Sequence, residues 1–281
     1  MSSDAGLLDL HAHSRASDGV LTPAQLAAAA AEAGLRALAL TDHDTVDGVA
    51  EFLAARAGSA LELIGGVEIS LEHPGTFHLL GLNVAGDAGI PAALDRLKTF
   101  RVERNLKLQD KIARMGYRLP WEALLKVAQG GQMGRPHFAA LLVERGFFRS
   151  RDEVFDKLLG KGRPGYVNKT RLSPEDGLAM IRAAGWAPVL AHPLSLGLAP
   201  EDWPAWLGRL KDGGLAGLEV YHPSQGPDQS AFFLDLARRF DLTPTAGSDF
   251  HGDDKPASPL GWTVKHSPLG REMLEELRSR I

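Results

Sequence analysis

Nine side chains of the kinds that bind metal ions occur in short sequence islands spread along the 281-residue chain. Six of them are histidines, three are carboxylates, and the chain contains no cysteine. Imidazole and carboxylate ligands without thiolates suit two or three divalent ions held for hydrolysis. The nine candidate ligands are His11, His13, Asp18, His43, Glu68, His78, His192, Asp249 and His251.

The spacing of these residues favours a shared site over isolated roles. His11 and His13 are two residues apart, so on a strand their side chains point the same way and can bind one ion. A single histidine is more often a packed or exposed residue, but this pair is followed by Asp18 in Ser-Asp-Gly and His43 in Thr-Asp-His-Asp. Three converging carboxylates without cations would repel one another and lose solvation. The cluster therefore predicts bound cations.

Composition limits the classes of protein to consider. The length allows one large α/β domain or two small ones, with enough apolar residues for a core. We find no apolar run long enough to cross a bilayer and no N-terminal leader, so we expect a soluble, cytoplasmic protein without membrane contact. The absence of cysteine excludes disulfides, thiolate zinc sites and a cysteine nucleophile.

Charge is distributed unevenly along the chain. The net charge of −4 argues against a general duplex-DNA binder, but residues 90–172 hold 18 Lys and Arg against 8 Asp and Glu. This basic segment is either a solvated helical surface or an electrostatic lid for an anionic substrate, and both interpretations stay open. A nucleic-acid binding domain would need aromatic stacking positions, and only 7% of the residues are aromatic.

Short apolar runs alternate with helical patterns at both ends of the sequence, which indicates a parallel sheet flanked by helices. Pro23 begins an alanine-rich helix that Thr22 caps and Gly34 ends, and Ser173 caps a later helix. The predicted strands are residues 7–10, 37–40, the run ending at 67, 77–84, 187–191, 215–221 and 243–246, and the predicted helices of this part include 24–33, 46–57 and the one starting at 174.

A helical segment interrupts this alternation between the fourth and fifth strands. Its predicted helices are 94–115, 135–145 and 152–159. Nearly every candidate ligand falls at the C-terminal end of a strand, where barrel enzymes place their chemistry. We therefore predict an α/β fold with a broken or short barrel formed by residues 1–90 and 172–281. Residues 91–171 would form a basic helical insertion that acts as a substrate lid.

The islands resemble the four motifs of the PHP (polymerase and histidinol phosphatase) family over almost the whole chain. The resemblance implies a distorted seven-stranded β/α barrel with a two- or three-metal centre. It also implies how the ligands divide among the ions: His11, His13, Glu68 and Asp249 for one, Glu68, His78 and His192 for a second, and Asp18, His43 and His251 for a third.

Within the family, the chain resembles phosphatases that remove the 3′-phosphate from nucleoside 3′,5′-bisphosphates, some relatives of which are 5′→3′ ribonucleases on short RNA. The resemblance rests on Asp18, the helical insertion, and the segments 134–139, 162–167 and 219–223. Hydrolysis of another small phosphate ester, such as histidinol phosphate, is the alternative. Asp18 argues against it, because histidine is usual at this position in histidinol phosphatases. A non-catalytic module stabilised by metal is a second alternative.

The expected chemistry follows from charge. Three divalent ions and three carboxylates would leave a net charge of about +3, which favours a phosphate dianion and its transition state. We predict that a metal-bridging water, held by Glu68, His192 and His251, attacks the phosphorus in line. Manganese is the expected metal, with iron or zinc as alternatives, because nitrogen and oxygen ligands accept all three.

Several further residues are candidates for contacts with the substrate. Arginine binds phosphate in a bidentate manner, so Arg135 could hold the phosphate that is not hydrolysed, with His137 beside it. Surface solvation is the competing interpretation for Arg163 and Lys169. His222 follows a strand and either lines the base or ribose pocket or is structural.

Two carboxylates beside His43 are candidates for orienting imidazoles, namely Asp42 and Asp44. Asp44 could equally be the N-cap of the next helix. The remaining histidines, His73 and His266, match no motif and are expected at the surface. The sequence does not indicate an oligomeric state.

Overall fold

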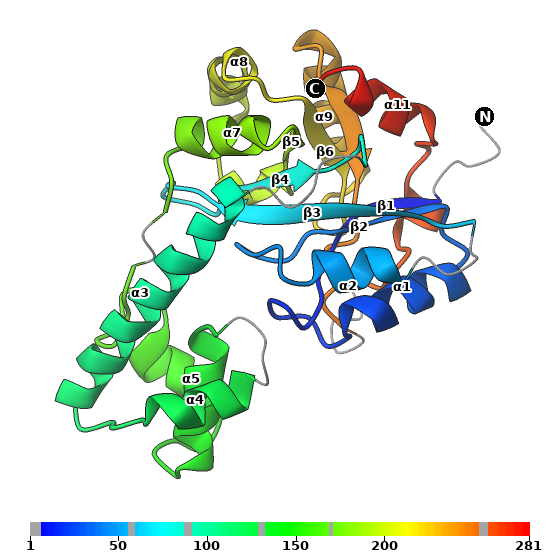
Figure 1. The fold of residues 1–281 in the computed structure, drawn as a ribbon. Coiled ribbons are helices and arrows are strands. Elements are labelled where there is room, and N and C mark those ends of the chain that lie inside the picture. Colours follow the sequence, from blue (N-terminus) through cyan, green and yellow to red (C-terminus); the bar gives the residue numbers. More distant parts are fainter. Residues whose placement is uncertain (1–6, 56–59, 87–91, 129–132, 169–170, 253–257) are drawn as a thin grey trace. The chain divides into compact units, whose positions relative to one another are not determined.

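The chain consists of two compact units. The first, which we call the barrel unit, joins Met1–Asp95 to Leu172–Ile281, and the second, the insertion unit, is Arg96–Arg171. Within the described residues, every helix is too short or too polar to span a bilayer. The computed structural model describes residues 7–55, 60–86, 92–128, 133–168, 171–252 and 258–281 (Figure 1).

Seven strands form one sheet in which each strand pairs with the next along the chain. The sheet curls until its two edges meet, where Ala12 bridges to Phe250 and the His13 amide donates to the Phe250 carbonyl at 2.8 Å. This nearly closed barrel confirms the predicted fold class. The strands are β1 (Leu8–Ala12), β2 (Ala37–Leu40), β3 (Glu62–Ser70), β4 (His78–Leu82), β5 (Ala187–Leu190), β6 (Gly217–Tyr221) and β7 (Thr243–Ala246).

One strand runs against the others. β4 is antiparallel to both β3 and β5, so the prediction of a parallel sheet is wrong at this position. The physical reason is the short connection after β3, because a parallel partner would need a long crossover, usually a helix. The reversal places the first residue of β4, His78, opposite Ser70 near the end of β3. His78 therefore reaches the same rim as the ligands that follow parallel strands.

Alternate residues of each strand enter different parts of the core. In β2, Ala37 and Ala39 pack in a cluster with Leu8 and Leu10, whereas Leu38 and Leu40 belong to a cluster that includes residues of the first two helices. The helices of the barrel unit are α1 (Pro23–Glu32), α2 (Val49–Ala54), α7 (Pro174–Ala183), α8 (Trp203–Asp212), α9 (Pro227–Arg239), α10 (Thr263–His266) and α11 (Glu272–Arg278), with 3-10 turns η2 (Pro193–Leu196) and η3 (Pro200–Asp202).

The predicted N-cap is correct for α1 and wrong for α2. The Thr22 hydroxyl accepts from the Gln25 amide and the Gln25 side chain accepts from the Thr22 amide, which forms the capping box of α1 and confirms the predicted cap. α2 starts three residues later than predicted, because Gly48 is its N-cap. Asp44 is therefore not the cap of α2, and that interpretation is wrong.

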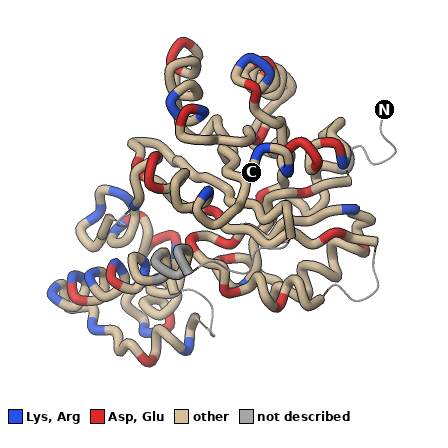
Figure 2. The backbone as a smooth tube through the Cα atoms, turned by 45° about the horizontal axis from the view of Figure 1, so that its top comes forward, with Lys and Arg blue, Asp and Glu red and all other residues tan. Residues whose placement is uncertain are grey.

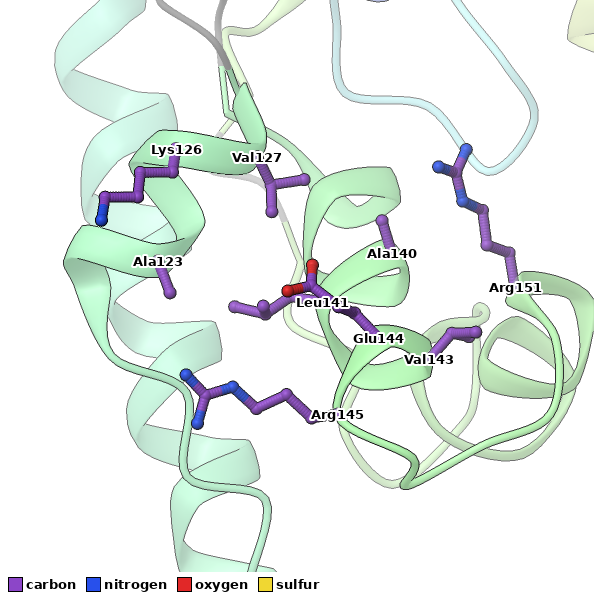
Figure 3. A pocket seen from close by; sticks show the side chains of 9 residues that line it. All are labelled: Ala123, Lys126, Val127, Ala140, Leu141, Val143, Glu144, Arg145 and Arg151. Atoms are coloured by element: carbon purple, nitrogen blue, oxygen red, sulfur yellow. The ribbon is translucent and has the colours of Figure 1, made fainter.

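The insertion unit has a core of its own, in which Phe138, Leu141 and Leu142 are buried with residues of the neighbouring helices. Lys and Arg are dense along it (Figure 2). A hollow of about 650 Å³ lies between α4, which the sequence did not predict, and α5, with Leu141 and Arg145 in its lining (Figure 3). The helices of this part are α3 (Ala92–Arg114), α4 (Trp121–Ala128), α5 (Arg135–Glu144) and α6 (Arg151–Val154), followed by the π-helix η1 (Phe155–Leu159).

The packing of α2 predicts very different costs for two neighbouring truncations. Phe52 is 0% exposed in the core, whereas Leu53 is 37% exposed. We expect Phe52→Ala to lower the free energy of unfolding by about 3–5 kcal/mol because it leaves a cavity. Leu53→Ala should cost well under half of that. Urea denaturation of both variants measures the difference, and equal losses would contradict the assigned orientation of α2.

Candidate metal centre

One carboxylate, Glu68 near the end of β3, lies at the centre of the cluster and is fully buried. Both of its oxygens face imidazole nitrogens, which come from five different histidines. The distances from Oε1 are 2.7 Å to His78 Nδ1, 2.9 Å to His192 Nε2 and 3.4 Å to His11 Nε2, and those from Oε2 are 2.7 Å to His43 Nδ1 and 3.3 Å to His13 Nε2.

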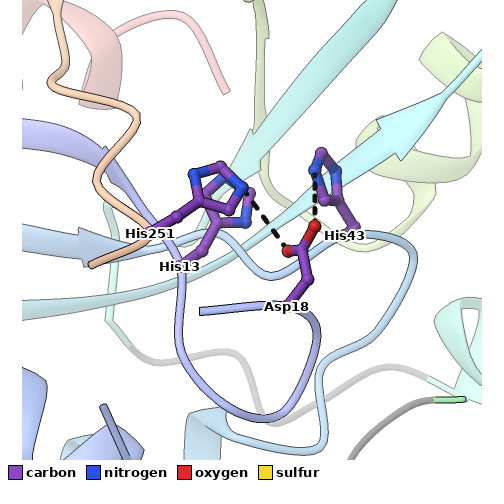
Figure 4. A group of neighbouring side chains, drawn as sticks. All are labelled: His13, Asp18, His43 and His251. Carbon is purple, nitrogen blue, oxygen red and sulfur yellow. Dashed lines mark ion pairs between the residues drawn. The ribbon is translucent and has the colours of Figure 1, made fainter. Parts of the chain in front are cut away.

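The structure brings all nine candidate ligands together at one rim of the barrel. Their ligand atoms form groups that agree in part with the division among ions implied by the family resemblance. His13 and His43 each enter a further group, and His192 is in none of the groups formed by the described residues. In Figure 4, Asp18 lies between His43 and His251. The groups whose ligand atoms lie within 4.8 Å of one another include His11, His13, Glu68 and Asp249; His13, Asp18, His43 and His251; and His43, Glu68 and His78. The Nε2 of His192 lies 3.2 Å from the Nδ1 of His78.

Several atoms of this cluster are buried without a hydrogen-bond partner among the described residues. They include His11 Nε2 and both ring nitrogens of His13. Buried polar atoms in native proteins nearly always have a partner, and a coordinated cation would supply one here. The donor set and its unsatisfied atoms therefore fit divalent metal ions.

The protonation states of Glu68, His13 and His78 also suit metal binding. Burial opposes the charge of Glu68, yet His43, His78 and His11 bring its pKa well below the usual range, so it is an anion at neutral pH. Burial, together with neighbouring His251 and His43, lowers the pKa of His13 to about 3. Burial likewise lowers the pKa of His78 to about 4. These two rings are therefore neutral and present lone pairs, as metal ligation requires.

Hydrogen bonds at Nδ1 orient three of the rings. His11 Nδ1 lies 3.1 Å from the carboxylate of Glu219, and His251 Nδ1 lies 2.8 Å from the carbonyl of Asp249. His192 Nδ1 lies 2.7 Å from the Ser195 hydroxyl, which itself donates to a carbonyl. Because each of these partners accepts, each Nδ1 carries the hydrogen and leaves the Nε2 lone pair for a metal.

Comparison with known proteins identifies the family. A model of the PHP domain matches residues 9–133. A 3′,5′-nucleoside bisphosphate phosphatase from Chromobacterium violaceum is 33% identical over 279 residues, which cover 98% of this chain and 97% of that protein. The chain belongs to the PHP family. It is a metal-dependent phosphoesterase, which confirms the resemblance seen in the sequence.

Two other PHP proteins extend this likeness. The 5′-3′ exoribonuclease Rnm from Salmonella typhimurium is 36% identical over 279 residues, covering 96% of this chain and 90% of that protein. A solved structure from Bifidobacterium adolescentis, described as a metal-dependent phosphoesterase, matches 97% of this chain and 96% of its own with a TM-score of 0.78 and 28% identity. The solved structure thus shares the fold of this chain, and the Rnm relative is named as a ribonuclease.

Glu219, which was not predicted from the sequence as a site residue, contacts two ligands of the PHP centre at once. One of its carboxylate oxygens binds the ring of His11, and the other accepts the backbone amide of His192 at 2.5 Å. Glu219 is buried in β6. A carboxylate inside an otherwise apolar strand was the available signal, because a buried charge needs partners.

The two carboxylates beside His43 order the surrounding backbone. Asp42 accepts from the amide and hydroxyl of Ser14 at 2.8 and 2.7 Å and from the Ser17 hydroxyl at 2.6 Å. These contacts fix the loop between His13 and Asp18. Asp44 accepts from the Ser70 amide at 2.9 Å, beside the end of β3.

Backbone strain is concentrated at the same rim. Asp44, His192 and Asp249 have φ values of 51°, 25° and 53°, in a region that residues other than glycine rarely occupy. Such strain persists only where the surroundings determine the conformation. The Asp249 amide donates to the His11 carbonyl at 2.8 Å, which is one such constraint.

The residues predicted to contact the substrate, and the two histidines expected at the surface, have different surroundings. Arg135 donates to the Leu159 carbonyl at 3.2 Å and lies over the Tyr166 ring, and burial lowers its pKa. The ring of His137 accepts the Gly134 amide at the start of α5. The exposed Arg163, half-buried His73 and exposed His266 lie at the surface, buried His222 lies beside Asp249, and Lys169 falls outside the described residues.

Gly247 allows the close approach of His11 to Glu219. A Cβ at this position would collide with His11 Cβ and a carboxylate oxygen of Glu219. We expect Gly247→Ala to lower metal affinity or activity by about 10–100-fold, because it displaces the group that orients a ligand. Metal content by elemental analysis and phosphate release check this outcome.

The matched control is Gly208→Ala in α8, where the nearest atom outside the local helix backbone would lie 3.8 Å from the new Cβ. This variant should retain both metal and activity. If Gly247→Ala behaved like Gly208→Ala, the contact between His11 and Glu219 would not matter for the centre.

Proposed function

We propose that this phosphoesterase removes the 3′-phosphate from nucleoside 3′,5′-bisphosphates and releases a nucleoside 5′-monophosphate. The observation that carries the proposal is the match to the Chromobacterium violaceum phosphatase, which extends over 98% of this chain. The complete set of nine candidate ligands supports turnover rather than a purely structural role for metal. A 5′→3′ exonuclease activity on short RNA is a second candidate, supported by the relative named Rnm.

We assign the centre two or three divalent ions. Manganese is the leading candidate, and iron and zinc are alternatives because nitrogen and oxygen ligands accept all three metals. When bound, these ions would supply Lewis acidity and lower the pKa of a water molecule enough for attack at neutral pH. Glu68 would hold two of the ions, and His192 and His251 would present Nε2 lone pairs beside it. Asp18 and Asp249 remain anionic, since the loss of solvation in the cluster opposes their charge but nearby imidazoles lower their pKa values.

A bisphosphate also needs a contact for the phosphate that is not hydrolysed, and we propose Arg135 for it. Its guanidinium has five N–H donors, of which the structure shows one bound to the Leu159 carbonyl. The guanidinium also lies over the ring of Tyr166, 5.2 Å from its centroid. The net positive charge of the insertion unit further favours an anionic substrate.

Phosphate release from adenosine 3′,5′-bisphosphate in the presence of manganese tests the proposed activity, with histidinol phosphate and a simple aryl phosphate as comparisons. We expect the highest kcat/KM with the bisphosphate. A clear preference for histidinol phosphate would overturn the choice of substrate. Metal-loaded protein that hydrolyses none of the three would favour the non-catalytic module.

Arg135→Ala should reduce kcat/KM for the bisphosphate by about 10-fold or more, because it removes a charged phosphate contact worth roughly 1.5–3 kcal/mol. The loss with the aryl phosphate should be small. Tyr166→Leu removes the ring contact and keeps the guanidinium, so it should cost less with the bisphosphate than Arg135→Ala does. Equal losses of kcat/KM for both substrates would show that Arg135 does not determine the preference for the bisphosphate.

Metal removal should destabilise the protein as well as inactivate it. Ions that bind only the folded state stabilise it by about 2.7 kcal/mol at a free concentration 100 times the dissociation constant. We therefore expect a chelator to lower the melting temperature and manganese to restore it. An unchanged melting temperature in stripped, inactive protein would contradict metal binding to the buried cluster.

A further inference from the structure

The hydrogen bond at Nδ1 determines which ring nitrogen carries the hydrogen in four imidazoles of the centre. In His11, His192 and His251 this atom faces an acceptor, so the ring presents an Nε2 lone pair. His222 has the opposite arrangement. The backbone amide of Ser224 donates to its Nδ1 at 3.1 Å.

An amide N–H can only face a lone pair, so Nδ1 of His222 carries no hydrogen and Nε2 carries it. The Ser224 hydroxyl, 2.7 Å from the same nitrogen, is free to donate there as well. Because the amide belongs to the turn that follows β6, the fold itself fixes this form of the ring. His222 is thus a neutral N–H donor at Nε2.

The Nε2 of His222 is buried and has no hydrogen-bond partner among the described residues. Its nearest carboxylate oxygen is Asp249 Oδ2 at 3.7 Å, and its ring centroid lies 5.6 Å from that of His192 and 6.2 Å from that of His11. A buried donor without an acceptor costs free energy, so an acceptor is expected at this position. The metal centre is where an anionic substrate would supply one.

We propose that His222 is a catalytic residue that donates a hydrogen bond from Nε2 to an oxygen of the phosphate being hydrolysed. This role adds a residue to the mechanism of the phosphoesterase. It rests on the proposed function only for the identity of the leaving group. His222 stabilises negative charge and transfers no proton, because loss of the Nε2 hydrogen would leave an anionic ring.

Metal ligation is the competing role for this ring. The ligand atoms of His11, Glu219 and His222 lie close enough to hold an ion. However, the Nε2 of His222 carries a hydrogen and its Nδ1 lone pair is engaged by Ser224, so neither nitrogen is available to a metal. The two carboxylate oxygens of Glu219 are also engaged, one with the ring of His11 and the other with the His192 amide.

Nitrogen NMR of histidine-labelled, zinc-loaded protein tests the ring directly, without any substrate. The signal missing from His222→Gln identifies His222. We expect a neutral ring with its hydrogen on Nε2, in contrast to His11, His192 and His251. A hydrogen on Nδ1, or a metal-bound Nε2, would overturn the proposal.

Kinetics of His222→Phe test the catalytic role. We expect kcat to fall by about 10²–10³-fold, as for loss of a donor to a developing anion, with an unchanged metal content. His222→Gln, which keeps an N–H donor, should recover part of the activity. His266→Phe at the exposed surface is the matched control and should behave as the unaltered protein.

The kinetics are measured with both the bisphosphate and the aryl phosphate. Failure of the proposed substrate can then be distinguished from failure of the proposed role of His222. Loss of bisphosphate preference alone would remove the proposed substrate and leave the effect of His222 measurable on the aryl ester. An unchanged kcat in His222→Phe, or loss of a metal ion from it, would show that His222 does not act on the phosphate.

Discussion

The carboxylate of Glu68 is fully buried, and nitrogens of five imidazoles lie between 2.7 and 3.4 Å from its oxygens. Placing an anion in the interior costs several kcal/mol unless it is paired, and neutral imidazoles pair it only weakly. Divalent cations meet this requirement and also use the ring nitrogens. The need to compensate one central charge therefore explains why so many ligands converge on a single rim.

The barrel brings these ligands together by two different routes. Parallel strands deliver His13, Asp249 and His192 at or just after their C-terminal ends, as in other β/α barrels. The reversed strand β4 instead delivers His78 at its start. Glu219 then stabilises this arrangement of ligands, because one of its oxygens contacts the ring of His11 and the other accepts the backbone amide of His192.

Much of this arrangement could be predicted from residues alone. The types and spacing of the nine ligands predicted a hydrolytic metal centre, and the alternation of elements predicted a barrel. Glu219 was missed because its role depends on contacts with His11 and His192, which are far from it in sequence. The direction of β4 was missed because an apolar run has the same pattern in either orientation. The tautomer of His222 depends on where one backbone amide points, which the residue types do not reveal.

Shared ligands have a consequence for the way this centre fills. His13, Glu68 and His43 each belong to two of the groups that could hold an ion. An ion that orders Glu68 also positions its second oxygen for the neighbouring ion, whereas a neutral His13 or His43 has one lone pair and can bind only one of the two ions, and the two cations repel each other. The sites are therefore thermodynamically linked, and the linkage is reciprocal: whatever the first ion does to the affinity for the second, the second does to the first. Loading of the centre is a property of the whole cluster, and no single dissociation constant describes it.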